Sequence, residues 1–293
     1  MLSRTESRKQ IIENFKKNVL GKYPTESELN LTHDGQLGHW FEKNLGGEID
    51  SDGNADLNGF ECKTHKGKIS WGDWSAPYRI YCDKSYKLFN KNKLFENMWT
   101  LVEALGVSRD TPKEGIFYSM SGKGFPSYFD DKTEIGFSLS EDKGDISYMY
   151  NFSSDQRKSK YDTVPIELQK DNLLIFKWYG TDVSFNDFKD NVINNKLPIE
   201  VKFSGKNASC SLEERVRRKF GIYGIVIGLR NKSRGFYGLE FSKSISFEDW
   251  LYFFKCKNII YDTALTTKNR RPYNQWRSSK AFMKTLEEEI YIP

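Results

Sequence analysis

The sequence feature that most constrains the fold is a short segment that begins at Asp56 and reads DLNGFECKT. Side chains alternate between the two faces of a β-strand, so Glu61 and Lys63 point to the same side. Phe60 and Cys62 point to the other side, where they suit a hydrophobic core. The acid and the amine therefore emerge together, with Asp56 at the base of the same hairpin-like segment. Two carboxylates beside one lysine can hold a divalent cation and place a water next to it.

A helix is predicted directly before this strand. Leu37, Phe41 and Leu45 recur at every fourth position, which places them on one apolar helical stripe. The glycine pair that follows supplies the left-handed stop that ends a helix. Glu42 lies beside the stripe near the helix end, and a turn rich in Asp, Ser, Gly and Asn leads back into the strand. This arrangement brings Glu42 next to Asp56.

Together these residues resemble the motif of the PD-(D/E)xK nucleases. Within that family they are similar to the branch that contains the mismatch-repair nicking enzyme MutH and the restriction enzymes MvaI and BcnI. The pattern is G-x-x-x-E-x-x-L-G on a helix followed by D-x4-E-x-K-T, and the matching residues are Gly38, Glu42, Leu45, Gly46, Asp56, Glu61, Lys63 and Thr64. The proline that often precedes the first Asp is replaced here by Ala55.

The resemblance implies a fold and a chemistry. The fold is an α/β (α+β) restriction-endonuclease-like core, a mixed sheet flanked by helices, with a second lobe for DNA recognition. We expect Asp56, Glu61 and the main-chain carbonyl of Cys62 to bind Mg²⁺, for which Mn²⁺ can substitute. We expect Lys63 to orient the attacking water and help to deprotonate it, and Glu42 to hold a second ion or its waters. The implied enzyme is a type II restriction endonuclease that hydrolyses phosphodiesters at a specific site in double-stranded DNA and leaves 5′-phosphate and 3′-hydroxyl ends.

Other interpretations stay open at this point. A strand-nicking mismatch-repair enzyme similar to MutH, or an endonuclease similar to Sau3AI, would use the same residues. A non-catalytic DNA-binding module is an alternative of a different class, in which Glu61 and Lys63 form a surface ion pair on a solvated strand. Because 29% of the residues are charged, such a pattern also arises by chance. The helix that carries Glu42 at the matching spacing favours the catalytic interpretation.

The charge distribution favours a polyanionic substrate. The net charge is +5, yet residues 201–293 contain 18 Lys and Arg against 9 Asp and Glu, so the positive charge is concentrated in the last third of the chain. An acidic first part that holds the carboxylates and a basic last part suit a metal-dependent enzyme that acts on nucleic acid. We expect a catalytic nuclease lobe over residues 1–120 and a DNA-recognition lobe over residues 121–293.

Composition also limits the cellular setting. The sequence has no window of about 18 apolar residues, so no membrane span is expected. Its N-terminus lacks the apolar core of a signal peptide. We therefore expect a cytoplasmic protein. No internal repeat supplies a second catalytic motif and no apolar helical seam predicts a dimer, so we expect a monomer. The resemblance adds a companion DNA methyltransferase in the host.

A polar segment with aromatic residues near the C-terminus carries the candidates for DNA recognition. Arg side chains read guanine O6 and N7, Asn and Gln read adenine N6 and N7, and Lys suits phosphate. A disordered tail is the alternative, but the aromatic residues argue for order. Together with one arginine from an earlier basic turn, the predicted DNA-binding residues are Arg230, Lys268, Arg270, Arg271, Tyr273, Asn274, Gln275 and Arg277.

Two further helices are predicted in the last third of the chain. Residues 211–221 form a compact helix that ends at a glycine, and residues 280–289 form the last helix. The cations of the first helix belong either to a phosphate-facing edge or to an ordinary solvated face, and the solvated face is favoured. These cations are Arg215, Arg217, Arg218 and Lys219.

Overall fold

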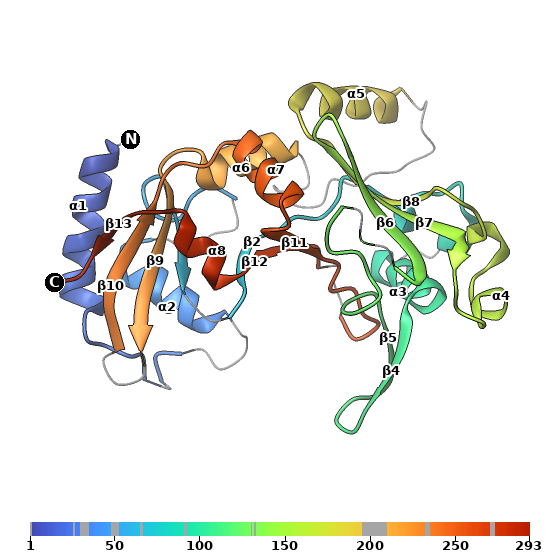
Figure 1. Cartoon of the computed structure of the whole chain (residues 1–293), viewed down its shortest axis with the longest axis horizontal. Helices are drawn as coiled ribbons and strands as arrows, with labels where there is room; N and C mark the ends of the chain where they lie inside the picture. Colours follow the sequence, from blue (N-terminus) through green and yellow to red (C-terminus); the bar gives the residue numbers. More distant parts are fainter. Residues whose placement is uncertain are drawn as a thin grey trace. The chain divides into compact units, whose positions relative to one another are not determined.

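The structure is a computed structural model that describes residues 2–25, 27–29, 35–47, 53–64, 67–90, 93–129, 131, 133–194, 210–231, 235–269 and 273–293 (Figure 1). The chain forms two compact units, each built from segments that lie far apart in the sequence. The first unit comprises Met1–Ile69, Glu213–Tyr252 and Ser278–Pro293, and the second comprises Ser70–Leu212 and Phe253–Arg277. These units are discontinuous, whereas the lobes expected over 1–120 and 121–293 are continuous. The division of tasks between lobes stays a prediction.

A four-stranded mixed sheet organises the first unit, in the order β1-β9-β10-β13. β1 pairs with β9 in parallel, which sets Glu61 opposite Ile225 and Lys63 opposite Ile227. β10 is antiparallel to both β9 and β13. The predicted mixed sheet is thereby confirmed. The strands are β1 Phe60–Thr64, β9 Gly224–Asn231, β10 Gly235–Ser242 and β13 Glu287–Tyr291.

Helices flank this sheet (Figure 1). Ser3 begins the first of them with a capping box, in which its side chain and that of Glu6 each bind the main-chain N–H of the other. The helices predicted over residues 37–45 and 211–221 correspond to α2 and α6. The helices are α1 Arg4–Asn14, which continues as a π-helical turn over Phe15–Val19, α2 Gln36–Asn44, α6 Leu212–Phe220, α7 Phe247–Lys255 and α8 Lys280–Thr285.

The end of the chain departs from the prediction of a helix over residues 280–289. α8 is shorter than expected, and the residues that follow it form β13. Pairing with β10 satisfies the main-chain groups of this segment. Arg4 of α1 forms an ion pair with Glu288 at 2.5 Å. Arg8 forms another with Glu289. These contacts between the two ends of the chain outweigh the helical preference of the glutamates.

α2 packs on the sheet through aromatic rings. Phe41 is fully buried, and its ring stacks on that of Phe236 in β10 with 4.6 Å between the ring centroids. Gly228 of β9 lies against both rings, because a Cβ at this position would be 2.5 Å from Cζ of Phe41. This close approach sets the height of α2 above the sheet, and with it the position of Glu42.

The second unit contains two sheets and a separate hairpin. One sheet is antiparallel with the order β3-β8-β7-β6, the other has the order β11-β12-β2, and β4 pairs with β5. Three fully buried aromatic residues, Trp178, Tyr261 and Trp276, contact one another within its core. No helix in the described ranges is long and apolar enough to cross a membrane.

The strands of the second unit are β2 Ile69–Asp73, β3 Tyr78–Arg79, β4 Val107–Thr111, β5 Gly115–Ser119, β6 Ile135–Asp142, β7 Asp145–Asp155, β8 Leu173–Trp178, β11 Ile259–Asp262 and β12 Gln275–Ser278. Its helices are α3 Leu94–Leu105, α4 Lys160–Thr163 and α5 Asp182–Ile193.

Replacing Gly228 with alanine should lower the free energy of unfolding by about 1–3 kcal/mol, because the new methyl group meets two buried rings. Urea denaturation measures the loss. Gly38→Ala is the matched control, since a Cβ at that position in α2 meets nothing within 4 Å and alanine favours a helix. Equal stability of the Gly228 variant and the parent protein would contradict the packing described here.

Candidate active site

A tight turn folds Asp56 back against β1. Asn58 and Gly59 have positive φ angles of 47° and 105°. The residues on either side of them exchange main-chain hydrogen bonds of 2.9 and 3.0 Å. Asn-Gly is a pair that such a hairpin turn favours. Asp56 therefore stands beside the strand, and its Oδ2 accepts a hydrogen bond from the main-chain N–H of Cys62 at 2.9 Å.

β1 divides its side chains between the core and the site, as the alternation predicts. Phe60 is fully buried and Cys62 is 8% exposed, and both belong to the hydrophobic core. On the other face, Lys63 Nζ donates a hydrogen bond to Glu61 Oε1 at 2.5 Å. Glu61 is only 1% exposed. The strand thus carries a charged pair with very little access to water.

A second lysine also binds Glu61. Lys219 of α6 donates a hydrogen bond to the same oxygen, Oε1, at 2.8 Å. The other oxygen, Oε2, is buried and has no hydrogen-bond partner among the residues that the structure describes. Burial alone would raise the pKa of Glu61, but the charges of Lys63 and Lys219 outweigh burial and hold the pKa below its usual value. Glu61 is therefore a carboxylate with one oxygen available to a further cation.

The other two acids of the motif show the opposite electrostatic effect. Burial, and then the negative charge of Glu61, raises the pKa of Asp56 to about 6. Burial, and then the charges of Asp56 and Glu61, raises the pKa of Glu42 to about 7. The three carboxylates therefore lie close enough to repel one another. α2 does bring Glu42 into the neighbourhood of the strand, as its spacing predicts.

The donor set fits a hard divalent cation. In the part of the chain that the structure describes, no group of His, Cys, Asp and Glu side chains encloses a ready-made metal site. Mg²⁺ does not require one, because it prefers oxygen ligands and retains several waters. Asp56 and the unpartnered Oε2 of Glu61 offer such oxygens, as does a main-chain carbonyl. The raised pKa values of Asp56 and Glu42 reflect burial first and then repulsion by the neighbouring acids, and a bound dication would favour the charged form of both groups.

The cations of α6 divide into two groups. Arg217 and Arg218 form ion pairs with Glu214 at 2.6 and 2.5 Å, as expected of a solvated face. Arg215 is 2% exposed, and the ammonium of Lys219 binds the acid on β1. The prediction of a solvated face is therefore wrong for Arg215 and Lys219. Lys219 is a site residue that the interpretation of the sequence missed.

The sequence contains a signal that would have revealed Lys219. An amphipathic helix faces its core with residues spaced i, i+3, i+4, i+7 and i+8. A cation within such a stripe requires a nearby anion, and for Lys219 that anion is Glu61. The residues of α6 that follow this spacing are Leu212, Arg215, Val216, Lys219 and Phe220.

Strand β12 retains two of the predicted DNA-binding residues at its surface. Gln275 and Arg277 are partly exposed, whereas Trp276 and Ser278 between and after them are buried. Arg277 binds Gln275, and its guanidinium lies 3.5 Å from Asp262. Gln275 and Arg277 remain candidates for reading bases.

The prediction for Asn274 is wrong. Asn274 is fully buried, and its Oδ1 accepts a hydrogen bond from the hydroxyl of Tyr261 at 2.5 Å. Its main-chain N–H donates to Asp73 at 2.8 Å. Asn274 therefore links the start of β12 to β11 and β2, and its side chain does not reach a DNA base.

The other candidates are engaged within their own units or lie outside the described residues. Lys268 donates to the main-chain oxygen of Glu114 in the turn between β4 and β5. Arg230, in the first unit, donates to the hydroxyl of Tyr23 at 2.8 Å. DNA binding by these residues stays a prediction. It stays so for Tyr273, which is partly buried, and for Arg270 and Arg271, which lie outside the described residues.

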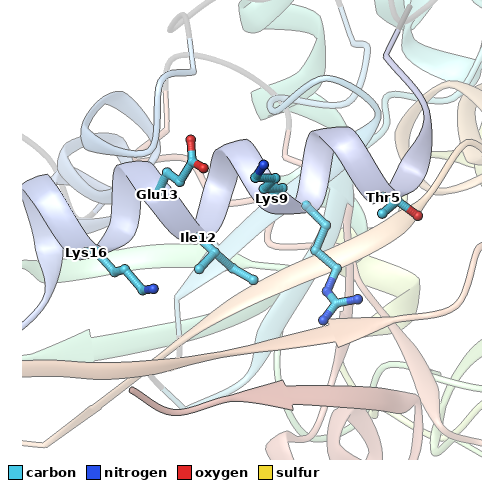
Figure 2. Close-up of a pocket in the computed structure, with 6 residues that line it drawn as sticks. Thr5, Lys9, Ile12, Glu13 and Lys16 are labelled. Carbon is cyan, nitrogen blue, oxygen red and sulfur yellow. The ribbon is translucent and has the colours of Figure 1, made fainter.

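A hollow of about 410 Å³ along α1 is separate from this site (Figure 2). None of the acids and lysines described above borders it. Its lining comes from one helix and consists of Thr5, Arg8, Lys9, Ile12, Glu13 and Lys16.

Known proteins resemble this chain over most of its length. A family model described as LlaMI restriction endonuclease matches residues 20–290. The type II restriction enzyme ScrFI of Lactococcus lactis subsp. cremoris is 29% identical over 283 residues, which is 96% of this chain and 97% of that enzyme. A solved complex of the restriction endonuclease MvaI with its cognate DNA substrate is matched over 100% of this chain and 99% of that one, with a TM-score of 0.50 and 12% identity. At this identity the likeness to MvaI concerns the fold alone.

The raised pKa of Asp56 predicts how stability depends on pH without metal. The folded state binds this proton more tightly than the unfolded chain, so the stabilisation that it provides is lost as the pH rises through about 6. Asp56→Asn removes the charge and keeps an oxygen for the N–H of Cys62. In EDTA, the variant should be more stable than the parent by about 1–3 kcal/mol at pH 8 and by less at pH 5. Chemical denaturation at both pH values measures the difference, and a variant less stable than the parent at pH 8 would contradict it.

Proposed function

Because the chain belongs to the LlaMI restriction endonuclease family, we propose that Asp56, Glu61 and Lys63 form the site at which it hydrolyses double-stranded DNA. The chain is a type II site-specific deoxyribonuclease, consistent with its full-length likeness to ScrFI. The restriction-endonuclease branch indicated by the motif is confirmed. The observation that carries the catalytic assignment is the convergence of the three side chains on β1. The expected products carry 5′-phosphate and 3′-hydroxyl ends.

Restriction endonucleases generally use a divalent metal ion, and we take the ion here to be Mg²⁺, with Mn²⁺ as a substitute. Asp56, Glu61 and the main-chain carbonyl of Cys62 would hold it. Such an ion supplies positive charge to the phosphoryl group and makes water more acidic. Lys63 would orient the attacking water with an N–H that Glu61 does not use, and its positive charge would help the water to lose a proton to solvent by stabilising the hydroxide. Glu42 would hold a second ion or its waters.

We assign catalysis to the first unit and much of DNA recognition to the second. MvaI has been solved with its cognate DNA substrate, which supports duplex DNA as the substrate of a chain with the same fold. Lys268 would contact phosphate, while Gln275 and Arg277 would read bases. One catalytic motif per chain suits a monomer that cuts one strand at a time. A cytoplasmic location and a companion DNA methyltransferase follow from this role.

Asp56→Ala, Glu61→Ala and Lys63→Ala should each abolish cleavage of plasmid DNA in Mg²⁺ while specific binding persists, because the side chains proposed to read bases lie elsewhere. Glu42→Ala should be impaired to a smaller extent. Gel electrophoresis follows cleavage, and a gel-shift assay in Ca²⁺ follows binding. Treatment with EDTA should stop the parent enzyme.

Lys43→Ala is the matched control, since Lys43 is an exposed neighbour of Glu42 on α2 and should be dispensable for cleavage. Near-normal cleavage by any two of the three alanine variants on the strand segment would refute the site. Binding without cleavage by the parent enzyme in Mg²⁺ would indicate a DNA-binding module. Nicking confined to hemimethylated sites would indicate a repair enzyme.

Arg277→Ala should cost about 1–3 kcal/mol of specific binding and relax one base position, because a methyl group cannot replace a paired contact with guanine. Lys268→Ala should weaken binding to all sequences and flatten its dependence on salt. Binding to randomised duplexes at low and high salt distinguishes the two effects. If both variants lose thermal stability and bind DNA as the parent does, this segment is scaffold.

A further inference from the structure

A second lysine reaches the proposed catalytic carboxylate from a distant part of the sequence. Lys219 Nζ lies 2.8 Å from Glu61 Oε1, and Lys63 Nζ lies 2.5 Å from the same oxygen. The side chain of Glu61 is 1% exposed, and those of Lys63 and Lys219 are 19% and 18% exposed. Two ammonium groups therefore share one oxygen of a carboxylate that is nearly sealed from water.

One lysine neutralises one carboxylate, and removing a further charge from water is unfavourable, so the second lysine exceeds what the ion pair of Glu61 alone requires. Its charge also acts on Asp56 and Glu42, the other two acids of the site. Within the described ranges of the chain, the shared oxygen also leaves Oε2 of Glu61 without a hydrogen-bond partner, although Oε2 is buried. A buried carboxylate held for stability alone would use donors on both oxygens. The placement of both lysines on Oε1 keeps Oε2 for another partner.

The same turn of α6 also forms a hydrogen bond with Ala55, the residue that precedes Asp56. The main-chain oxygen of Arg218 accepts a hydrogen bond from the N–H of Ala55 at 3.1 Å. The helix is itself anchored, because Val216 and Phe220 are fully buried. One helical turn therefore contacts both segments that carry the proposed metal ligands.

We propose that Lys219 is a positioning residue of the catalytic centre, which holds Oε1 of Glu61 so that Oε2 is presented to the divalent cation. This inference rests on the proposed function. It leaves the other N–H bonds of Lys63 to the attacking water. Lys219 also places a positive charge near the cation, so it orients the ligand while weakening the affinity for the ion.

Lys219→Met tests this role, since it keeps the apolar stem and removes the charge. In single-turnover assays on plasmid DNA with saturating Mg²⁺, cleavage should be about 10–100-fold slower than in the parent enzyme. Without DNA, Mg²⁺ should raise the melting temperature of the variant more than that of the parent, because the ion no longer meets the charge of Lys219. General damage to the helix would not make the enzyme slower and its response to Mg²⁺ stronger at once.

Matched variants separate charge from structure. Lys219→Arg keeps the positive charge, so it should recover part of the rate and respond to Mg²⁺ as the parent does. Arg217→Met, on the exposed side of α6, should leave both measurements unchanged. If Lys219→Met does not fold, Lys219→Gln carries the same two expectations, because its uncharged side chain is one bond shorter and its amide does not reach Oε1 of Glu61.

Two results would overturn the inference. One is a parent-like rate for the uncharged Lys219 variant. The other is a slow variant whose melting temperature rises with Mg²⁺ by no more than that of the parent. Failure of the parent enzyme to cleave any plasmid would instead refute the proposed function, which keeps the two failures distinct.

Discussion

A carboxylate removed from water is the constraint on which the first unit depends. A charge as deeply buried as that of Glu61 is stable only with close counter-ions, and the fold supplies them from two places. Parallel pairing with β9 orders β1, and the docking of α6 delivers the second lysine. The turn at Asn58 returns Asp56 to the same place, where its negative charge is not balanced in this way. The contacts that stabilise the sheet therefore also create a site in which three carboxylates face two ammonium groups.

How much of this site follows from the sequence depends on the distance between the parts along the chain. The strand with Glu61 and Lys63, its turn and the helix with Glu42 are local, so alternation, an Asn-Gly pair and helical spacing suffice to predict them. Lys219 lies 158 residues beyond Glu61. Its approach depends on which strand pairs with β1 and on how α6 packs, and neither is encoded in a short window. The spacing within α6 indicates that Lys219 faces the core and needs an anion. Only the fold shows that this anion is Glu61.

The errors have the same origin. Residues 280–289 have the composition of a helix. Their last residues nevertheless form a strand, because they pair with β10 and form ion pairs with the arginines of α1. Asn274 belongs to a segment rich in DNA-binding residue types, yet a tyrosine hydroxyl and an aspartate hold it in the core. In both cases a residue far away in sequence decides the outcome, and local preference is the weaker effect. The two units are discontinuous for the same reason: contacts between residues far apart in sequence define them. The chain leaves the first unit and returns to it twice.

The pairing of α1 with β13 joins the two ends of the chain within one unit (Figure 1). During synthesis, the motif between Glu42 and Lys63 leaves the ribosome long before β9, α6 and β13 do. A nascent chain therefore has Asp56, Glu61 and Lys63 but neither the strand that pairs with β1 nor Lys219. β13, the last strand of the sheet, is made after every segment of the second unit. The order of synthesis therefore lets the second unit fold before the sheet of the first unit is complete.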